Sequence, residues 1–173
     1  RLASDLSLVY RLGRKALESL YKIRLLGLVP KKNLPNYSEF YEMRHFEPAN
    51  EELDYIEYPG EEEQEWIPFG MQQIFYCPQM EGLTVAAEIC EDLWVPQPPS
   101  ITHAIAGANV IVNLSASDEI TGKDSYRRNL VGGQSARLVC GYIYADAGEG
   151  ESSTDLVFAA HNLIAENGTI LAQ

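Results

Sequence analysis

Apolar residues near the start of the chain recur at the spacing of one helix face. These positions are Leu6, Val9, Leu12, Ala16, Leu17, Leu20 and Tyr21. They follow Ser4, whose hydroxyl can cap a helix N-terminus, so the pattern predicts an amphipathic helix that ends near Lys22. The apolar run Ile23–Val29 then predicts a buried strand, which Pro30 ends.

The later part of the chain alternates between strand-like and helix-like stretches. Strands are predicted in "PFGMQQIFYC", "LTVAAEIC", "NVIVNLSAS" and "VCGYIYADA". Helices are predicted after the prolines that open "PPSITHAIAGA" and over Asp124–Leu138. The stretch "TDLVFAAHNLIAENGTIL" predicts a hairpin with its turn at "ENG". This order of elements predicts an α/β fold of layered, mixed sheets.

Two polar segments separate the predicted elements. The proline-containing stretch that begins at Pro30 predicts a loop, followed by a short extended piece over Phe40–Phe46. Nine acidic residues and no Lys or Arg lie between Glu47 and Glu65. This composition predicts a solvated acidic loop or irregular hairpin, with a partner-binding or lid segment as the alternative.

Composition and charge narrow the class of protein. With 173 residues, 46% hydrophobic and 22% charged, the chain can form one globular domain over 1–173. The apolar runs are too short for a membrane span. The net charge is −12 and no Lys or Arg occurs between Arg44 and Lys123, which argues against nucleic acid as a partner. Both ends fall in mid-pattern, so we expect a longer parent protein.

The cysteines point to a reducing compartment and away from a metal site. Cys77, Cys90 and Cys140 cannot all pair within one chain, and none has CxxC spacing. A cytoplasmic location and the absence of a bound metal are therefore the simplest expectations.

Cys90 ends a predicted strand, where open α/β sheets place their ligands. It is followed by Glu91 and Asp92, and nearby carboxylates raise a thiol pKa. A nucleophilic Cys90 therefore needs a cation from elsewhere in the fold, for which Lys31 and Lys32 are the candidates. The alternatives are a buried, inert cysteine and a pair of solvated lysines.

Four ordered stretches carry a resemblance to a known family. "VPKKNLPNYSEFYEMRHF" and "EICEDLWVP" resemble the nitrilase, or carbon–nitrogen hydrolase, superfamily. "NLSASDEITGKDSYRRNL" and "YADAGEGESSTDLVFAAHNLIAENG" resemble the glutaminase domain of glutamine-dependent NAD synthetases. The resemblance covers nearly the whole chain and implies a four-layer α-β-β-α sandwich, incomplete here at its N-terminus.

The resemblance also implies roles for individual residues. Cys90 would attack the glutamine side-chain amide to form a thioester, while Lys31 and the backbone N–H of Glu91 stabilise the oxyanion. Glu42 would be the additional carboxylate that orders the lysine. The implied substrate-binding positions are Tyr37, Trp94, Ser117 and Lys123. From the residues alone, a packing role for Tyr37, a turn for Ser117 and a core position for Trp94 stay open.

The sequence departs from the family pattern in three ways. The triad glutamate that acts as general base is expected before Arg1, and a strand pair expected after the first helix is missing. No "SGGxDS"-like nucleotide loop occurs, so ATP and magnesium would belong to a synthetase domain outside this chain. Within these 173 residues no cofactor is expected, and the chain alone is expected to have little or no activity.

The implied function is glutamine hydrolysis that supplies ammonia for the ATP-dependent amidation of nicotinic acid adenine dinucleotide to NAD. The implied partners are glutamine, the synthetase domain and further copies of the protein. Two other hypotheses stay open. One is a free-standing nitrilase-type amidase for another small amide, and the other is a non-catalytic scaffold that has lost its base.

Overall fold

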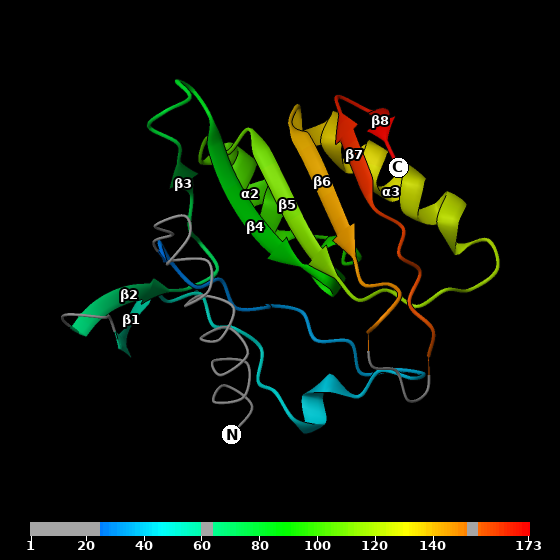
Figure 1. Cartoon of the computed structure of the whole chain (residues 1–173), viewed down its shortest axis with the longest axis horizontal. Coiled ribbons are helices and arrows are strands. Elements are labelled where there is room, and N and C mark those ends of the chain that lie inside the picture. The colour runs from blue at the N-terminus through cyan, green and yellow to red at the C-terminus, as the bar shows by residue number, and fades with distance from the viewer. Residues whose placement is uncertain (1–24, 60–63, 152–155) are drawn as a thin grey trace.

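The computed structural model describes residues 25–59, 64–151 and 156–173. The helix predicted from Ser4 to Lys22 lies outside these residues. A mixed α/β fold is formed by the described part (Figure 1), as the sequence predicts. Among the described residues, no helix is long and apolar enough to cross a membrane.

A six-stranded sheet forms the centre of the fold, in the order β3-β4-β5-β6-β7-β8. Its strands are β3 (Phe75–Tyr76), β4 (Thr84–Ile89), β5 (Val110–Ser115), β6 (Gly141–Asp146), β7 (Leu163–Glu166) and β8 (Thr169–Ala172). β4, β5 and β6 are parallel, and the other neighbours pair antiparallel. The carboxyl ends of the three parallel strands therefore meet at one edge, where α/β sheets place ligands.

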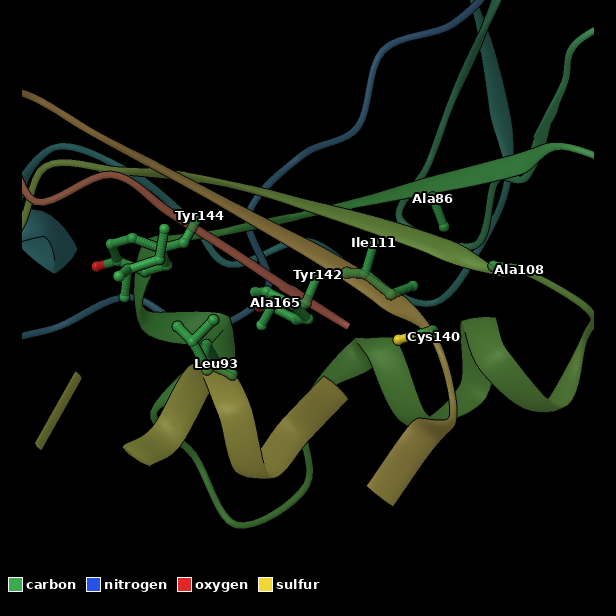
Figure 2. Close-up of a cluster of buried hydrophobic side chains, with 10 residues drawn as sticks. Ala86, Leu93, Ala108, Ile111, Cys140, Tyr142, Tyr144 and Ala165 are labelled. Carbon is green, nitrogen blue, oxygen red and sulfur yellow. The ribbon is translucent and has the colours of Figure 1, made fainter. Parts of the chain in front are cut away.

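Two helices cover one face of this sheet, α2 (Pro99–Ile105) and α3 (Lys123–Leu138). Proline at the first position of α2 suits a helix start, because that position has no intrahelical partner for an N–H. The β-strand register places Ala86, Ile111, Tyr142 and Ala165 in one row beneath the helices. These residues, with Leu93 and Val131, belong to the buried apolar core (Figure 2).

The opposite face of the sheet is apolar and open. The register aligns Ala87, Val112, Ile143 and Ile164 across four strands on this face. Leu114 is 57% exposed, Ile143 37% and Ile164 42%. In the described residues, one layer of helices thus packs on the central sheet, rather than the four layers that the resemblance implies.

The acidic segment contributes to a regular antiparallel strand pair, whereas the sequence predicted a loop or an irregular hairpin. β1 (Asp54–Pro59) pairs antiparallel with β2 (Gln64–Phe69). Figure 1 shows this hairpin apart from the central sheet. It joins the preceding segment through a parallel bridge between Leu28 and Phe69.

Three strand predictions were wrong in extent or type. Residues 25–29 make only the Leu28 bridge, because no neighbouring strand is in register with the remaining apolar residues. The piece predicted as extended over Phe40–Phe46 instead contains the 3-10 helix η1 (Glu42–Arg44). The predicted strand in "PFGMQQIFYC" is divided between the end of β2 and the short strand β3. The strands and helices from Thr84 to Asp146 were predicted correctly, within a few residues at their ends. The predicted C-terminal hairpin is present with its turn at "ENG", but its first strand, β7, begins only at Leu163.

Candidate active site

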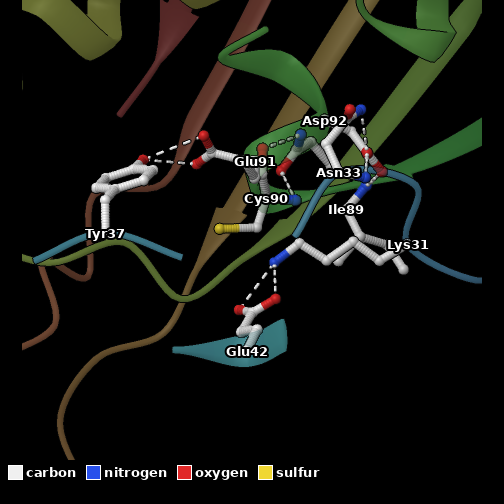
Figure 3. A network of polar contacts seen from close by, with 9 residues as sticks. Lys31, Asn33, Tyr37, Glu42, Ile89, Cys90, Glu91 and Asp92 are labelled. Carbon is white, nitrogen blue, oxygen red and sulfur yellow. Dashed lines mark hydrogen bonds and ion pairs between the residues drawn. The ribbon is translucent and has the colours of Figure 1, made fainter. Parts of the chain in front are cut away.

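Cys90 occupies a sharp turn at the carboxyl edge of the sheet. It follows β4 and begins the 3-10 helix η2 (Cys90–Leu93). Its φ of 48° lies in the left-handed region, which costs a non-glycine residue about 1 kcal/mol or more. The turn directs the thiol out of the sheet edge, toward the loop that carries the predicted lysine (Figure 3).

Lys31 and Glu42 form an ion pair beside this thiol. The Lys31 Nζ donates hydrogen bonds to both Glu42 carboxylate oxygens, at 2.7 and 2.9 Å. Lys31 comes from the loop after Pro30, and Glu42 comes from η1. The Lys31 side chain is only 13% exposed, so this pair is screened from water more than a surface pair is. Lys32 points elsewhere and pairs with Glu51 at the surface.

Opposing effects act on the Cys90 thiol. Burial raises its pKa, and the Glu42 charge raises it further. The Lys31 ammonium, the backbone N–H of Ala116 and the Ser115 hydroxyl lower the pKa, but burial prevails. Lys31 is thus the cation that the sequence required for a reactive Cys90, and it only partly offsets burial.

Tyr37 and Glu91 form the opposite wall of the site. The Tyr37 hydroxyl donates to the Glu91 carboxylate oxygens, at 2.9 and 3.1 Å. Burial is the largest cause that raises the Glu91 pKa, while Tyr37, Lys31 and Lys123 act to lower it. Figure 3 shows the Cys90 sulfur between Tyr37 and the Lys31–Glu42 pair.

Asp92 ties the lysine loop to the cysteine turn, a role that the sequence reasoning missed. One of its carboxylate oxygens accepts hydrogen bonds from the backbone N–H and the side-chain amide of Asn33, at 2.8 and 2.9 Å. The other accepts the backbone N–H of Ile89 at 3.0 Å. An acidic residue three positions after the N-cap of a short helix is the signal that could have found this contact.

Two further predicted residues, Trp94 and Lys123, lie together where α3 begins. Trp94 stacks on Tyr126, with ring centroids 5.5 Å apart, and the Lys123 Nζ lies 5.1 Å from the Trp94 ring centroid. Lys123 is also paired with Asp118. The Lys123 charge acts to lower the pKa of the Glu91 carboxyl, which accepts the Tyr37 hydroxyl.

Ser117 is buried at the turn after β5. Its backbone N–H donates to Asp146 at 2.8 Å, and its hydroxyl accepts a hydrogen bond from Arg127 at 3.1 Å. Arg127 is itself fully buried and contacts His161. The structure therefore places Ser117 at the same sheet edge as Cys90, with its hydroxyl engaged by the interior.

The geometry unites residues from two distant stretches of the sequence, 31–42 and 90–91. Cys90, Lys31, Glu42, Tyr37 and Glu91 share one group of contacts and charges. Within the described ranges, no group of three or more His, Cys, Asp or Glu side chains could hold a metal ion. The chemistry available here is that of a thiol flanked by a cation, carboxylates and backbone N–H groups.

Comparison with solved structures gives the class of fold first. An amidase of the nitrilase superfamily from Nesterenkonia AN1 aligns with 82% of this chain and 43% of its own, with a TM-score of 0.56 and 15% identity. The chain has the mixed α/β fold of that superfamily. A glutamine-dependent NAD(+) synthetase from Cytophaga hutchinsonii aligns with 85% of this chain and 22% of its own, with a TM-score of 0.67 and 27% identity.

Sequence comparison relates the chain to a particular group of enzymes within this fold class. The glutamine-dependent NAD(+) synthetase of Mycobacterium tuberculosis is 42% identical over 154 residues, which are 89% of this chain and 22% of that protein. No family model matches the chain. The chain is homologous to the nitrilase-type glutaminase region of glutamine-dependent NAD synthetases, so the predicted family is confirmed. It spans about a fifth of the length of these relatives.

Proposed function

We propose that this region hydrolyses the side-chain amide of glutamine, with Cys90 as the nucleophile. The observation that carries the proposal is the position of the Cys90 thiol beside the Lys31–Glu42 ion pair, on a strained turn at the carboxyl edge of the sheet. Backbone strain and a largely buried lysine at the same place are typical of a functional site. The homology to glutamine-dependent enzymes supplies the substrate class.

In the proposed reaction, the Cys90 thiolate forms a bond to the amide carbon of glutamine. The negative charge that develops on the amide oxygen is stabilised by the Lys31 ammonium and by the backbone N–H of Glu91. The carbon–nitrogen bond then breaks, and the nitrogen takes up a proton and leaves as ammonia. Water hydrolyses the γ-glutamyl thioester, which releases glutamate and restores the thiol.

The thiol proton requires a base, and the two described carboxylates near it are already engaged. Glu42 accepts both hydrogen bonds from Lys31, and Glu91 accepts the Tyr37 hydroxyl. The raised pKa of Cys90 makes this requirement stricter, because fewer thiols are ionised without a base. We therefore keep the expectation that the triad glutamate comes from chain preceding Arg1.

The wall opposite the lysine suits the amino-acid end of glutamine. The Glu91 carboxylate can attract the α-ammonium, and the Lys123 ammonium can attract the α-carboxylate. Lys123 is paired with Asp118, so the substrate carboxylate would share or replace that contact. The Trp94 ring lies against the Lys123 ammonium and supports it. We propose that Tyr37 and Ser117 shape the space that the amino-acid end of glutamine would occupy.

The open apolar face of the sheet supports the four-layer architecture that the family resemblance implies. A continuous apolar face of this kind needs a covering layer, and a second sheet would complete the four-layer α-β-β-α sandwich. The ammonia would then pass to a synthetase domain, where ATP and magnesium support the amidation that forms NAD. A cytoplasmic, homo-oligomeric enzyme with glutamine as its nitrogen source is the setting that we propose.

Assay of the full-length protein against glutamine and a panel of simple amides tests the substrate class. We expect glutamine to be preferred, with one glutamate and one ammonia released per turnover. Preference for a simple aliphatic amide would favour the free-standing amidase. The absence of any amide hydrolysis would favour the non-catalytic scaffold.

A further inference from the structure

We propose that Asn113 is a positioning residue that fixes the backbone of Cys90 and thereby the direction of its thiol. Asn113 lies on β5, directly across from Glu88 of β4, and its side chain is fully buried. Its amide oxygen accepts the Cys90 backbone N–H at 3.1 Å, and its amide nitrogen donates to the Cys90 carbonyl at 3.4 Å. One side chain thus holds both backbone polar groups of the proposed nucleophile.

The orientation of the Asn113 amide follows from its neighbours. Tyr142 has a single hydroxyl proton, which it donates to the buried Glu88 carboxylate. The Tyr142 oxygen can then only accept, and the Asn113 nitrogen donates to it at 3.3 Å. Ser100 supplies its backbone N–H to the other Glu88 oxygen at 2.8 Å. This chain of contacts keeps the amide oxygen of Asn113 directed at Cys90.

The contact explains how a strained turn persists. The left-handed φ of Cys90 needs surroundings that compensate its cost, and two hydrogen bonds from a buried amide provide them. They also commit the Cys90 N–H to Asn113. Of the backbone donors at this turn, the N–H of Glu91 is left to the oxyanion in the proposed reaction.

Ser115 links the same amide to the thiol. The Ser115 hydroxyl donates to the Asn113 amide oxygen at 2.7 Å, and it is one of the groups that lower the Cys90 pKa. Because this hydroxyl has a single proton, it can donate either to Asn113 or to a Cys90 thiolate, and the contact with Asn113 keeps it beside the thiol.

The test uses Asn113→Ala and Asn113→Asp in the full-length protein. Asn113→Ala removes all of these contacts. Asn113→Asp keeps an oxygen for the Cys90 N–H, loses the donations to Tyr142 and the Cys90 carbonyl, and adds a negative charge near the thiol. We expect kcat for glutamine, per Cys90 site that can be alkylated, to fall about 100-fold in Asn113→Ala with little change in KM. We expect the pH profile of Cys90 alkylation by iodoacetamide to move to higher pH in Asn113→Asp.

Asn109→Asp is the matched control. Asn109 precedes the same strand, and its amide oxygen also accepts a backbone N–H from the neighbouring strand, that of Thr84 at 3.1 Å. It lies at the opposite end of β5 from Cys90. This variant disturbs strand pairing at the end of β5 away from Cys90. It should therefore leave kcat per site and the Cys90 alkylation profile unchanged.

The expected change in kcat for glutamine rests on the proposed function, whereas the expected change in Cys90 alkylation does not. Inactivity of the unaltered protein toward glutamine would overturn the proposed function, whereas the alkylation profiles would still test Asn113. Wild-type kcat per site and a wild-type alkylation profile in both Asn113 variants would overturn the role of Asn113. Should neither variant fold, hydrogen exchange in the unaltered protein decides, because a rapidly exchanging Cys90 N–H contradicts the Asn113 contact.

Discussion

Lys31 donates to both oxygens of Glu42, and this pair stands beside the Cys90 thiol. The two charges act on the thiol in opposite directions, since Lys31 lowers its pKa and Glu42 raises it. The pairing holds the ammonium in place, and the Glu42 charge offsets only part of the lowering of the thiol pKa by Lys31. Glu42 thus holds the lysine ammonium through two hydrogen bonds, and its role in ordering the lysine for catalysis stays a prediction.

Removal of the Lys31 charge should disable the thiol. Lys31→Met keeps much of the side-chain volume but removes the cation that lowers the Cys90 pKa. It also leaves Glu42 unpaired near the thiol. We expect the Cys90 alkylation profile to move to higher pH and glutamine hydrolysis to fall by about 100-fold or more. Alkylation rates, read on the Cys90 peptide by mass spectrometry, and steady-state kinetics measure the two effects.

Lys32→Met is the control for this change. Lys32 is the next residue, but its ammonium pairs with Glu51 at the surface. Exposed pairs of this kind contribute little, so both readouts should stay at their wild-type values. Equal effects of the two substitutions would contradict a specific role for Lys31.

Asp92→Ala should destabilise the site through its lost backbone contacts. The buried carboxylate accepts two hydrogen bonds from Asn33 and one from Ile89, and alanine leaves these donors without partners. We expect the free energy of unfolding to fall by about 3 kcal/mol. Urea denaturation measures it, with Glu51→Ala, a change in an exposed ion pair, as the comparison. Equal unfolding midpoints for the two variants would be evidence against the role of Asp92.

The sequence was most informative where the chemistry is local. Cys90 and Lys31 each stand in short stretches with a recognisable order of residue types, so both could be singled out without a structure. Asn113 could not, because its importance depends on the strand register that sets it opposite Glu88 and beside the Cys90 turn. A buried asparagine in an apolar strand is a weak signal until its hydrogen-bond partners are known.

The errors in the fold have a similar origin. The run Ile23–Val29 has the composition of a strand, but strands also need a partner in register. Among its described residues, 25–29, only Leu28 makes a bridge. The later strands were predicted well because the turns and helices between them leave few alternatives. Periodicity predicts which face of an element is apolar, whereas pairing between distant segments depends on the whole fold.

The Cys90 thiol should ionise at higher pH than a free cysteine. Burial is the largest influence on its pKa and raises it. Since the thiolate is the reactive form, the rate of Cys90 alkylation should increase with pH, with a midpoint above that of free cysteine. Alkylation of the Cys90 peptide and of free cysteine across the same pH series provides the comparison. A midpoint below that of free cysteine would show that nearby cations outweigh burial.

The proposed sandwich makes the open face of the sheet sensitive to charge. Ile143 lies on that face and is 37% exposed in the described residues. In the full-length protein, Ile143→Lys should reduce the free energy of unfolding by about 2 kcal/mol or more, through lost burial alone. Ile105→Lys on α2, at a position 83% exposed, is the control and should have little effect. If both variants unfold at the same denaturant concentration as the unaltered protein, the face is not covered.

The most direct test of the central claim compares two nitrogen sources in the Cys90→Ala variant of the full-length protein. Alanine removes the proposed nucleophile without altering the synthetase region. NAD formation supported by glutamine should be lost, while NAD formation supported by added ammonia should remain close to the wild-type rate. Glutamine-supported synthesis that survives in Cys90→Ala would contradict the assignment of Cys90 as the nucleophile that releases ammonia.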